Sequence, residues 1–262
     1  MRQRIALRAG WTGLLGTMLL LGLMPRAVSP AGATGSLIVD GDFEANKTST
    51  DLRNGAGRPG WYESRRDGKE GRALLQLSQK PVAGDATLKA MIKASPARNT
   101  YLSQRLVESQ TGSFSLQWDI LVKEILQPFN RSAFQMIGNA SVSGRGPNGA
   151  GKERYVFLGF ENAVAPGRMN LFAYEGGDTD QWDMKRVVVP GLELGKWYTV
   201  RVAVDTPSQA YTVEVLGTGG APVRVAAFRA KGAKSPAMLT HVSFASWNDG
   251  PGTFYIDNVR EP

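Results

Sequence analysis

The sequence contains no cysteine and only one histidine in 262 residues. The first absence excludes disulfide scaffolds, cysteine-based zinc sites and cysteine nucleophiles. The second excludes a metal site built from several histidines. Hydrophobic residues nevertheless make up 42% of the chain, which excludes a disordered protein. The chemistry left to a functional site is that of carboxylates, aromatic rings and at most one imidazole.

Long hydrophobic runs are also absent, except for one near the N-terminus. Residues 1–8 are basic with no acid, an apolar run covers 11–24, and small residues follow up to Ala33. This order is typical of a secretory signal peptide, and the run is short for a membrane-spanning helix of roughly 20 residues. We expect residues 1–33 to be removed, leaving a secreted or periplasmic protein without a membrane span. An uncleaved N-terminal anchor is the alternative.

The positive charge of the chain depends largely on that segment. It holds Arg2, Arg4, Arg8 and Arg26 and no acid, so its removal takes four from a formal net charge of +8. The remaining excess is too small to predict a nucleic-acid partner. It permits an acidic polysaccharide but does not require one. An exported chain without cysteine also favours a bacterial source.

Apolar and polar residues alternate with a period of two throughout residues 34–262. This period is typical of strands with one face on a core and one in solvent. The clearest candidates are 114–122, 197–205, 211–215, 238–246 and 253–259. Shorter candidates are 36–39, 74–79, 87–92, 100–106, 133–139, 154–161, 169–174, 185–189 and 223–229. Turn signals such as Pro190-Gly191 separate them. The sequence therefore predicts an all-β fold, a single antiparallel β-sandwich of the jelly-roll type over 34–262.

Short motifs at both ends resemble those of jelly-roll carbohydrate-binding modules. The stretch 37–44 (LIVDGDFE) followed by Gly60-Trp61 is similar to their opening, although Asp40 stands where asparagine is usual. The stretch 254–260 (FYIDNVR) is similar to their last strand, and 195–217 resembles concanavalin A-like sandwich domains. The resemblance implies a concanavalin A-like jelly roll. Its motifs support the fold far better than a function.

The same resemblance implies a structural calcium ion. In the resembled modules the ion joins a glutamate of the first strand to an aspartate of the last. The matching residues are Glu44 and Asp257, and Asp42 would add a further oxygen ligand. Carboxylate and carbonyl oxygens are the normal ligands of calcium. Alternatively, Asp257 caps the end of a strand and Glu44 is simply solvated.

Three aromatic residues are candidates for carbohydrate binding. Trp182 and Trp247 lie in segments rich in glycine, aspartate and asparagine, and Tyr174 faces away from the apolar residues of its strand. Pyranose rings stack on such side chains while neighbouring polar groups bind the hydroxyls. Each could instead pack within the fold. That is the expectation for Trp118, which alternates with core residues, and for Trp197, which begins a core strand.

Catalytic candidates are few. Glycoside hydrolysis needs paired carboxylates, and no strand carries the Glu-x-Asp-x-x-Glu pattern of laminarinase-type enzymes. Asp119 and Glu124 point to opposite faces because their spacing is odd. A polysaccharide lyase needs only a base and a group that stabilises the enolate, for which His241, Arg201 and Tyr155 are the candidates. The favoured alternative is that His241 is an ordinary strand residue.

The leading hypothesis is an exported, non-catalytic, lectin-like domain that recognises a polysaccharide. A polysaccharide lyase or glycoside hydrolase on the same fold is one alternative, and the lyase requires His241, Arg201 and Tyr155 to converge. A structural or adhesion protein of the cell envelope is another, which predicts that Trp182 and Trp247 pack inward. Apart from a structural calcium ion, no cofactor is expected.

Overall fold

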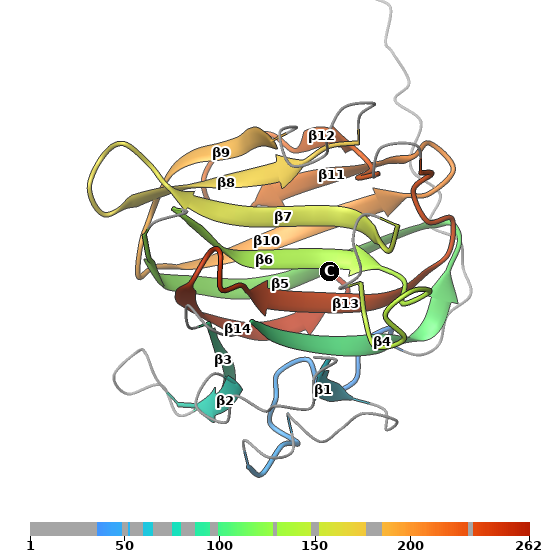
Figure 1. The fold of residues 1–262 in the computed structure, drawn as a ribbon, viewed down its shortest axis with the longest axis horizontal. Coiled ribbons are helices and arrows are strands. Elements are labelled where there is room, and N and C mark those ends of the chain that lie inside the picture. The colour runs from blue at the N-terminus through green and yellow to red at the C-terminus, as the bar shows by residue number, and fades with distance from the viewer. Residues whose placement is uncertain are drawn as a thin grey trace, which may run out of the picture. The chain divides into compact units, whose positions relative to one another are not determined.

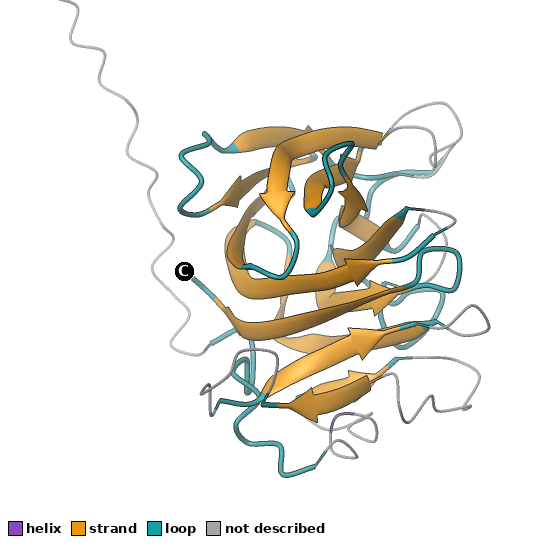
Figure 2. Ribbon diagram, turned by 90° about the vertical axis from the view of Figure 1, so that its left-hand side faces the viewer, coloured by secondary structure: helices purple, strands orange, loops and turns teal. Residues whose placement is uncertain are grey.

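The structure is a computed structural model whose named elements are all strands. Strands dominate the fold in Figure 2. It describes residues 36–48, 52, 60–64, 75–79, 87–94, 99–127, 130–147, 152–176, 185–229 and 233–262. The expected signal peptide, residues 1–33, and Trp182 lie outside these ranges. Residues Gly35–Pro262 form one compact unit. In the part of the chain that the structure describes, no helix has the length and apolar character needed to cross a membrane.

Two seven-stranded antiparallel sheets form a sandwich, and the strands of sheet A overlie those of sheet B in Figure 1. In spatial order, sheet A consists of β1 (Trp61–Glu63), β4 (Thr100–Gln110), β13 (Leu239–Ser246), β6 (Arg131–Gly138), β7 (Arg154–Asn162), β8 (Arg168–Tyr174) and β9 (Lys185–Glu193). Sheet B consists of β12 (Val223–Ala226), β11 (Ala210–Val215), β10 (Trp197–Asp205), β5 (Ser113–Ile125), β14 (Gly252–Arg260), β3 (Lys89–Lys93) and β2 (Leu75–Ser78). This arrangement confirms the predicted all-β antiparallel sandwich.

The main core lies between the two sheets and is built from alternate residues of their strands. On β5, for example, Leu116, Trp118 and Ile120 are completely buried. The indole Nε1–H of Trp118 donates a hydrogen bond of 2.9 Å to Gln135 Oε1 of β6. The prediction that Trp118 packs in the core is confirmed, and this bond ties sheet B to sheet A.

Two local expectations were wrong for identifiable reasons. Residues 36–39 form no strand, because Val39 bonds through its N–H and C=O to the side-chain amide of Gln104. Pro190 does not end its strand either. Strand β9 lies at the edge of sheet A, where a missing N–H is tolerated, and Gly191, with φ of 72°, takes up the irregularity.

A second apolar cluster lies on the outer face of sheet A, the face turned away from sheet B. On β7, for example, Leu158 belongs to the main core, whereas Phe157 points to the opposite side. We call this group the outer aromatic cluster: Phe134, Met136, Phe157, Phe172, Tyr174, Phe228, Ala245 and Trp247. One half of this face of sheet A is therefore packed with rings, and the other half is polar.

Candidate functional site

The polar half of the outer face spans three neighbouring strands. Tyr62 of β1 lies opposite Ser103 of β4, and Ser103 lies opposite Ser243 of β13. Two residues further along, Arg105 of β4 lies opposite His241 of β13. Residues two apart on a strand share a face, so all five side chains are on the same side of the sheet. We call these five residues the polar patch.

A chain of serine hydroxyls forms the floor of the patch. The Oγ of Ser103 donates a hydrogen bond of 2.7 Å to the Oγ of Ser243. The same atom lies 2.7 Å from the Oγ of Ser64, the residue that follows β1. All three side chains are buried. This row of hydrogen-bonded serines connects β1, β4 and β13 across the sheet. It thereby fixes the relative positions of the strands that carry the other polar residues of the patch.

His241 is neutral in this environment. Its side chain is only 8% exposed, and Nδ1 lies 2.7 Å from Thr240 Oγ1. The pKa of His241 is lowered to about 4. Burial is the main cause, and the positive charge of Arg105 adds to it. At neutral pH the imidazole therefore carries no charge, and one ring nitrogen can accept a hydrogen bond or a proton.

Tyr62 is a hydroxyl donor at the edge of the patch. The side chain is 7% exposed, and its Oη donates a hydrogen bond of 2.5 Å to the carbonyl oxygen of Arg145. Burial raises the pKa of Tyr62 to about 12, although Arg105 and Arg145 act in the opposite direction. The phenol therefore stays protonated at any physiological pH.

The loop 139–147, between β6 and β7, brings another arginine to the patch. On one side, Oε1 of the buried Glu153 accepts the backbone N–H groups of Val142 and Ser143, each at 2.6 Å. On the other side, the carbonyl of Arg145 accepts the tyrosine hydroxyl described above. This double attachment holds the exposed Arg145 beside the polar patch.

Two of the three predicted carbohydrate-binding aromatics belong to the outer aromatic cluster. Tyr174 is completely buried, and Trp247 is 4% exposed. The indole of Trp247 stacks on Phe134 with ring centroids 4.0 Å apart, and the guanidinium of Arg154 lies 5.0 Å from it. Their rings thus face other side chains in this structure. The third candidate, Trp182, lies outside the described residues.

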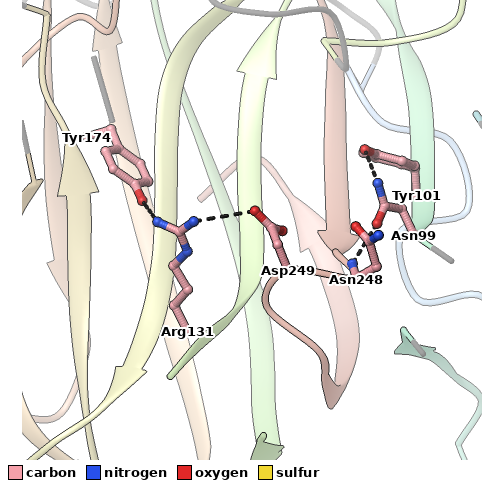
Figure 3. A network of polar contacts seen from close by, with 6 residues as sticks. All are labelled: Asn99, Tyr101, Arg131, Tyr174, Asn248 and Asp249. Atoms are coloured by element: carbon pink, nitrogen blue, oxygen red, sulfur yellow. Dashed lines mark hydrogen bonds and ion pairs between the residues drawn. The ribbon is translucent and has the colours of Figure 1, made fainter. Parts of the chain in front are cut away.

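A polar network holds the turn that follows β13 (Figure 3). Arg131 bridges it to β8, with one Nη donating to Tyr174 Oη at 2.7 Å and the other lying 3.4 Å from an Asp249 carboxylate oxygen. Asn99 accepts the backbone N–H of Asn248 at 2.5 Å. The network fixes the position of the indole that precedes this turn.

The three candidate lyase residues are not brought together. His241 is on the outer face of sheet A. Tyr155 is completely buried in the main core, where its Oη donates a hydrogen bond of 2.8 Å to the carbonyl of Asp205 on β10. Arg201 lies on the outer face of sheet B and donates to Gln117 Oε1 at 3.1 Å. Tyr155 and Arg201 thus cannot share a groove with the imidazole.

A β-bulge explains the position of Tyr155. Ile137 of β6 pairs with Val156 of β7, but the next residue, Gly138, pairs with Arg154. Tyr155 is therefore an extra residue that strict alternation does not describe. In its place, Arg105 of β4 is the neighbour of His241, and Tyr62 lies one strand further away, on β1. Leu102 and Leu106 face the core, and Arg105 at an odd spacing from both was therefore a usable signal for the other face. The three-residue strand that carries Tyr62 has no recognisable period.

The predicted calcium ligands accept hydrogen bonds from the backbone. Asp42 Oδ1 accepts the N–H of Glu44 at 3.3 Å, and Glu44 Oε1 accepts the N–H of Leu88 at 2.6 Å. Asp257 Oδ1 accepts the N–H of Asn258 at 2.7 Å. Within the described residues, no three histidine or acidic side chains form a group that could hold a metal ion. The calcium site stays a prediction.

Comparison with known proteins gives a fold and no family. No family model and no curated protein matches the chain. Among solved structures, the catalytic domain of the glycoside hydrolase family 131 protein from Coprinopsis cinerea is 12% identical, with a TM-score of 0.51 over 86% of this chain and 94% of that one. A family 131 β-glucanase catalytic domain from Podospora anserina is 16% identical, with a TM-score of 0.51 over 86% and 95%. A sialidase matches at 14% identity and a TM-score of 0.48, and this chain spans 18% of it. The predicted concanavalin A-like sandwich is confirmed.

Proposed function

We propose that this protein binds a polysaccharide on the outer face of sheet A, and that the polysaccharide carries carboxylate groups. The observation that carries the proposal is the exposed guanidinium of Arg105 beside the neutral His241 and the hydroxyl of Tyr62. Among the described residues, the guanidinium of Arg105 makes no hydrogen bond and no ion pair. A guanidinium binds a carboxylate through two parallel hydrogen bonds, so this position suits a uronate.

The neighbouring charges support an acidic ligand. Arg145 adds a second exposed cation next to the patch. The carboxylate near the patch, that of Glu153, already accepts two backbone N–H groups. The similar solved folds from Coprinopsis cinerea and Podospora anserina are catalytic domains of glycoside hydrolases, which supports carbohydrate as the ligand class.

Binding without turnover is the leading form of the proposal, and a lyase is the second candidate. The observation that favours the lyase is that Tyr62, Arg105 and His241 share one face. In such a reaction the neutral imidazole takes the proton next to the uronate carboxylate, and the arginine stabilises the resulting enolate. The phenol protonates the departing glycosidic oxygen, and the products are an unsaturated uronate and a new chain end.

The test is a binding titration with polygalacturonate and alginate, and with a neutral β-glucan for comparison. We expect both polyuronates to bind and Arg105→Gln to weaken them at least about tenfold. The matched control is Arg260→Gln, which removes one exposed charge from sheet B and should bind as the unmodified chain does. Equal binding by the two variants would overturn the proposal. Absorbance of unsaturated uronate in the same mixtures distinguishes a lyase from a binding protein.

A further inference from the structure

A pocket of about 290 Å³ opens on the outer face of sheet B, on the opposite side of the sandwich from the polar patch. Its lining includes the side chains of Thr87, Lys89, Asp119, Trp197, Thr199 and Asp257. The volume is at the lower end of the range for small-molecule sites. None of these residues takes part in the function proposed above.

Strand register builds a polar row along this pocket. Thr199 of β10 lies opposite Asp119 of β5, which lies opposite Asp257 of β14. The next strand is β3, where Ala90 pairs with Ile256, so Lys89 is the neighbour of Asp257. Hydroxyl, two carboxylates and ammonium thus follow one another across four strands.

Existing hydrogen bonds orient the groups of the row. Asp119 Oδ1 accepts the hydroxyl of Thr199 at 2.5 Å, and Oδ2 accepts the side-chain amide of Asn258 at 2.9 Å. Lys89 is 1% exposed, and its ammonium donates to the carbonyl and the hydroxyl of Thr87 at 2.8 and 2.7 Å. A carboxylate oxygen has two lone pairs, so the carboxylate of Asp119, already oriented by these two bonds, can accept further hydrogen bonds from a ligand.

An aromatic ring borders the same row. The expectation that Trp197 packs in the core was wrong: it is partly exposed and shares the outer face with Thr199, two residues along β10. Across the sheet, its neighbours in register are the apolar Leu121 and Tyr255. An apolar strip with an accessible indole therefore runs beside a strip of hydrogen-bonding groups.

We propose that this pocket binds one neutral pyranose unit, stacked on Trp197 with its hydroxyls bonded to the carboxylates. Sugars present an apolar C–H face and a polar edge, and the two strips match this division. The two carboxylates disfavour an acidic sugar, which leaves a neutral one. This second site is independent of the polar patch, because it lies on the other sheet.

The test is saturation-transfer NMR on the full chain with methyl glycosides of glucose, galactose and mannose. We expect at least one of them to bind, and Trp197→Leu and Asp119→Asn each to raise its Kd at least about tenfold. The control is Asp205→Asn, at the far end of β10, which should leave the Kd unchanged. Melting curves confirm that each variant is folded.

Two results would overturn this inference. One is that no methyl glycoside binds the unmodified chain at millimolar concentration. The other is that binding persists in both Trp197→Leu and Asp119→Asn, since the bound sugar would then lie elsewhere. Polyuronate binding that fails in Arg105→Gln but survives in these variants would separate the two sites, so either proposal can fail without the other.

Discussion

At the scale of single residues, the pKa of His241 is lowered and the pKa of Asp40 is raised, so the two groups have opposite effects on how stability changes with pH. Burial lowers the pKa of His241 from 6.5 to about 4. Burial raises the pKa of Asp40 from 3.8 to about 6, and the nearby carboxylates of Asp42 and Glu44 also raise it. Both groups therefore change the free energy of unfolding in the same pH range, with opposite signs.

For His241, folding favours the neutral form. Between about pH 4 and 6.5 the unfolded chain binds more protons, so the contribution of this residue to stability is full above pH 6.5 and is lost as the pH falls toward 4. We expect His241→Gln to remove this loss. Melting temperatures measured from pH 4 to 7 check it, and an unchanged slope in the variant would contradict the neutral, buried imidazole.

For Asp40, folding favours the protonated form. Its contribution is full below about pH 3.8 and is lost as the pH rises through about 6, where the folded carboxyl ionises. Because Asp40 is partly exposed, solvent reduces the size of the effect. We expect the melting temperature of Asp40→Asn to rise more steeply between pH 4 and 6 than that of the unmodified chain. The reason is that the stabilisation by His241, which grows with pH, is then no longer offset by Asp40. A profile identical to that of the unmodified chain would be evidence against the raised pKa.

Alternation predicted the orientation of some site residues and failed for others. It placed His241 on the face of the sheet that Val242 and Phe244, which point to the core, do not occupy, and the structure agrees. It could not place Tyr155, because a bulge adds a residue that breaks the period. It also could not show that Trp247 stacks on another ring, since that contact depends on a turn held by distant side chains.

At the scale of elements, β7 depends on a glycine beneath the outer aromatic cluster. A Cβ on Gly159 would lie 2.6 Å from the ring of Phe172 and 3.0 Å from that of Phe134. We expect Gly159→Ala to lower the free energy of unfolding by about 1–3 kcal/mol, as overpacking typically does. Chemical denaturation measures it. The control is Gly112→Ala, where a Cβ meets nothing within 4 Å, and its effect should stay within about 0.5 kcal/mol. Equal effects in both variants would argue against tight packing at β7.

The sequence predicted most strands to within a few residues, because their alternation is a direct result of having one face on a core. The strand expected over 197–205 coincides with β10. β1 was missed because three residues are too few to show a period. β9 was predicted too short because Pro190 is a stop signal inside a sheet but not at its edge.

At the scale of the whole molecule, the sandwich was predictable, whereas the two faces that carry the candidate sites were only partly so. Polar residues of β1, β4 and β13 meet on one face through a strand order that the sequence does not reveal. The pocket on sheet B likewise requires β3, β14, β5 and β10 to be neighbours. Pairing between distant segments is therefore the information that sequence patterns lacked.

Calcium is a prediction that concerns the whole fold, because Glu44 and Asp257 lie near opposite ends of the chain. If the ion binds, it stabilises the folded state only, so chelation with EDTA should lower the melting temperature. Asp257→Ala should then abolish the sensitivity to chelator. An unchanged melting temperature with EDTA would reject the ion and would leave these carboxylates as acceptors for backbone N–H groups.

The most direct test of polysaccharide binding on sheet A is hydrogen–deuterium exchange with and without polygalacturonate. Strand amides are already protected, so the loop 139–147 beside the polar patch is the informative segment. We predict that the ligand slows exchange there and leaves the loops of sheet B unchanged. Slower exchange confined to sheet B, or no change in 139–147 at saturating ligand, would contradict the account.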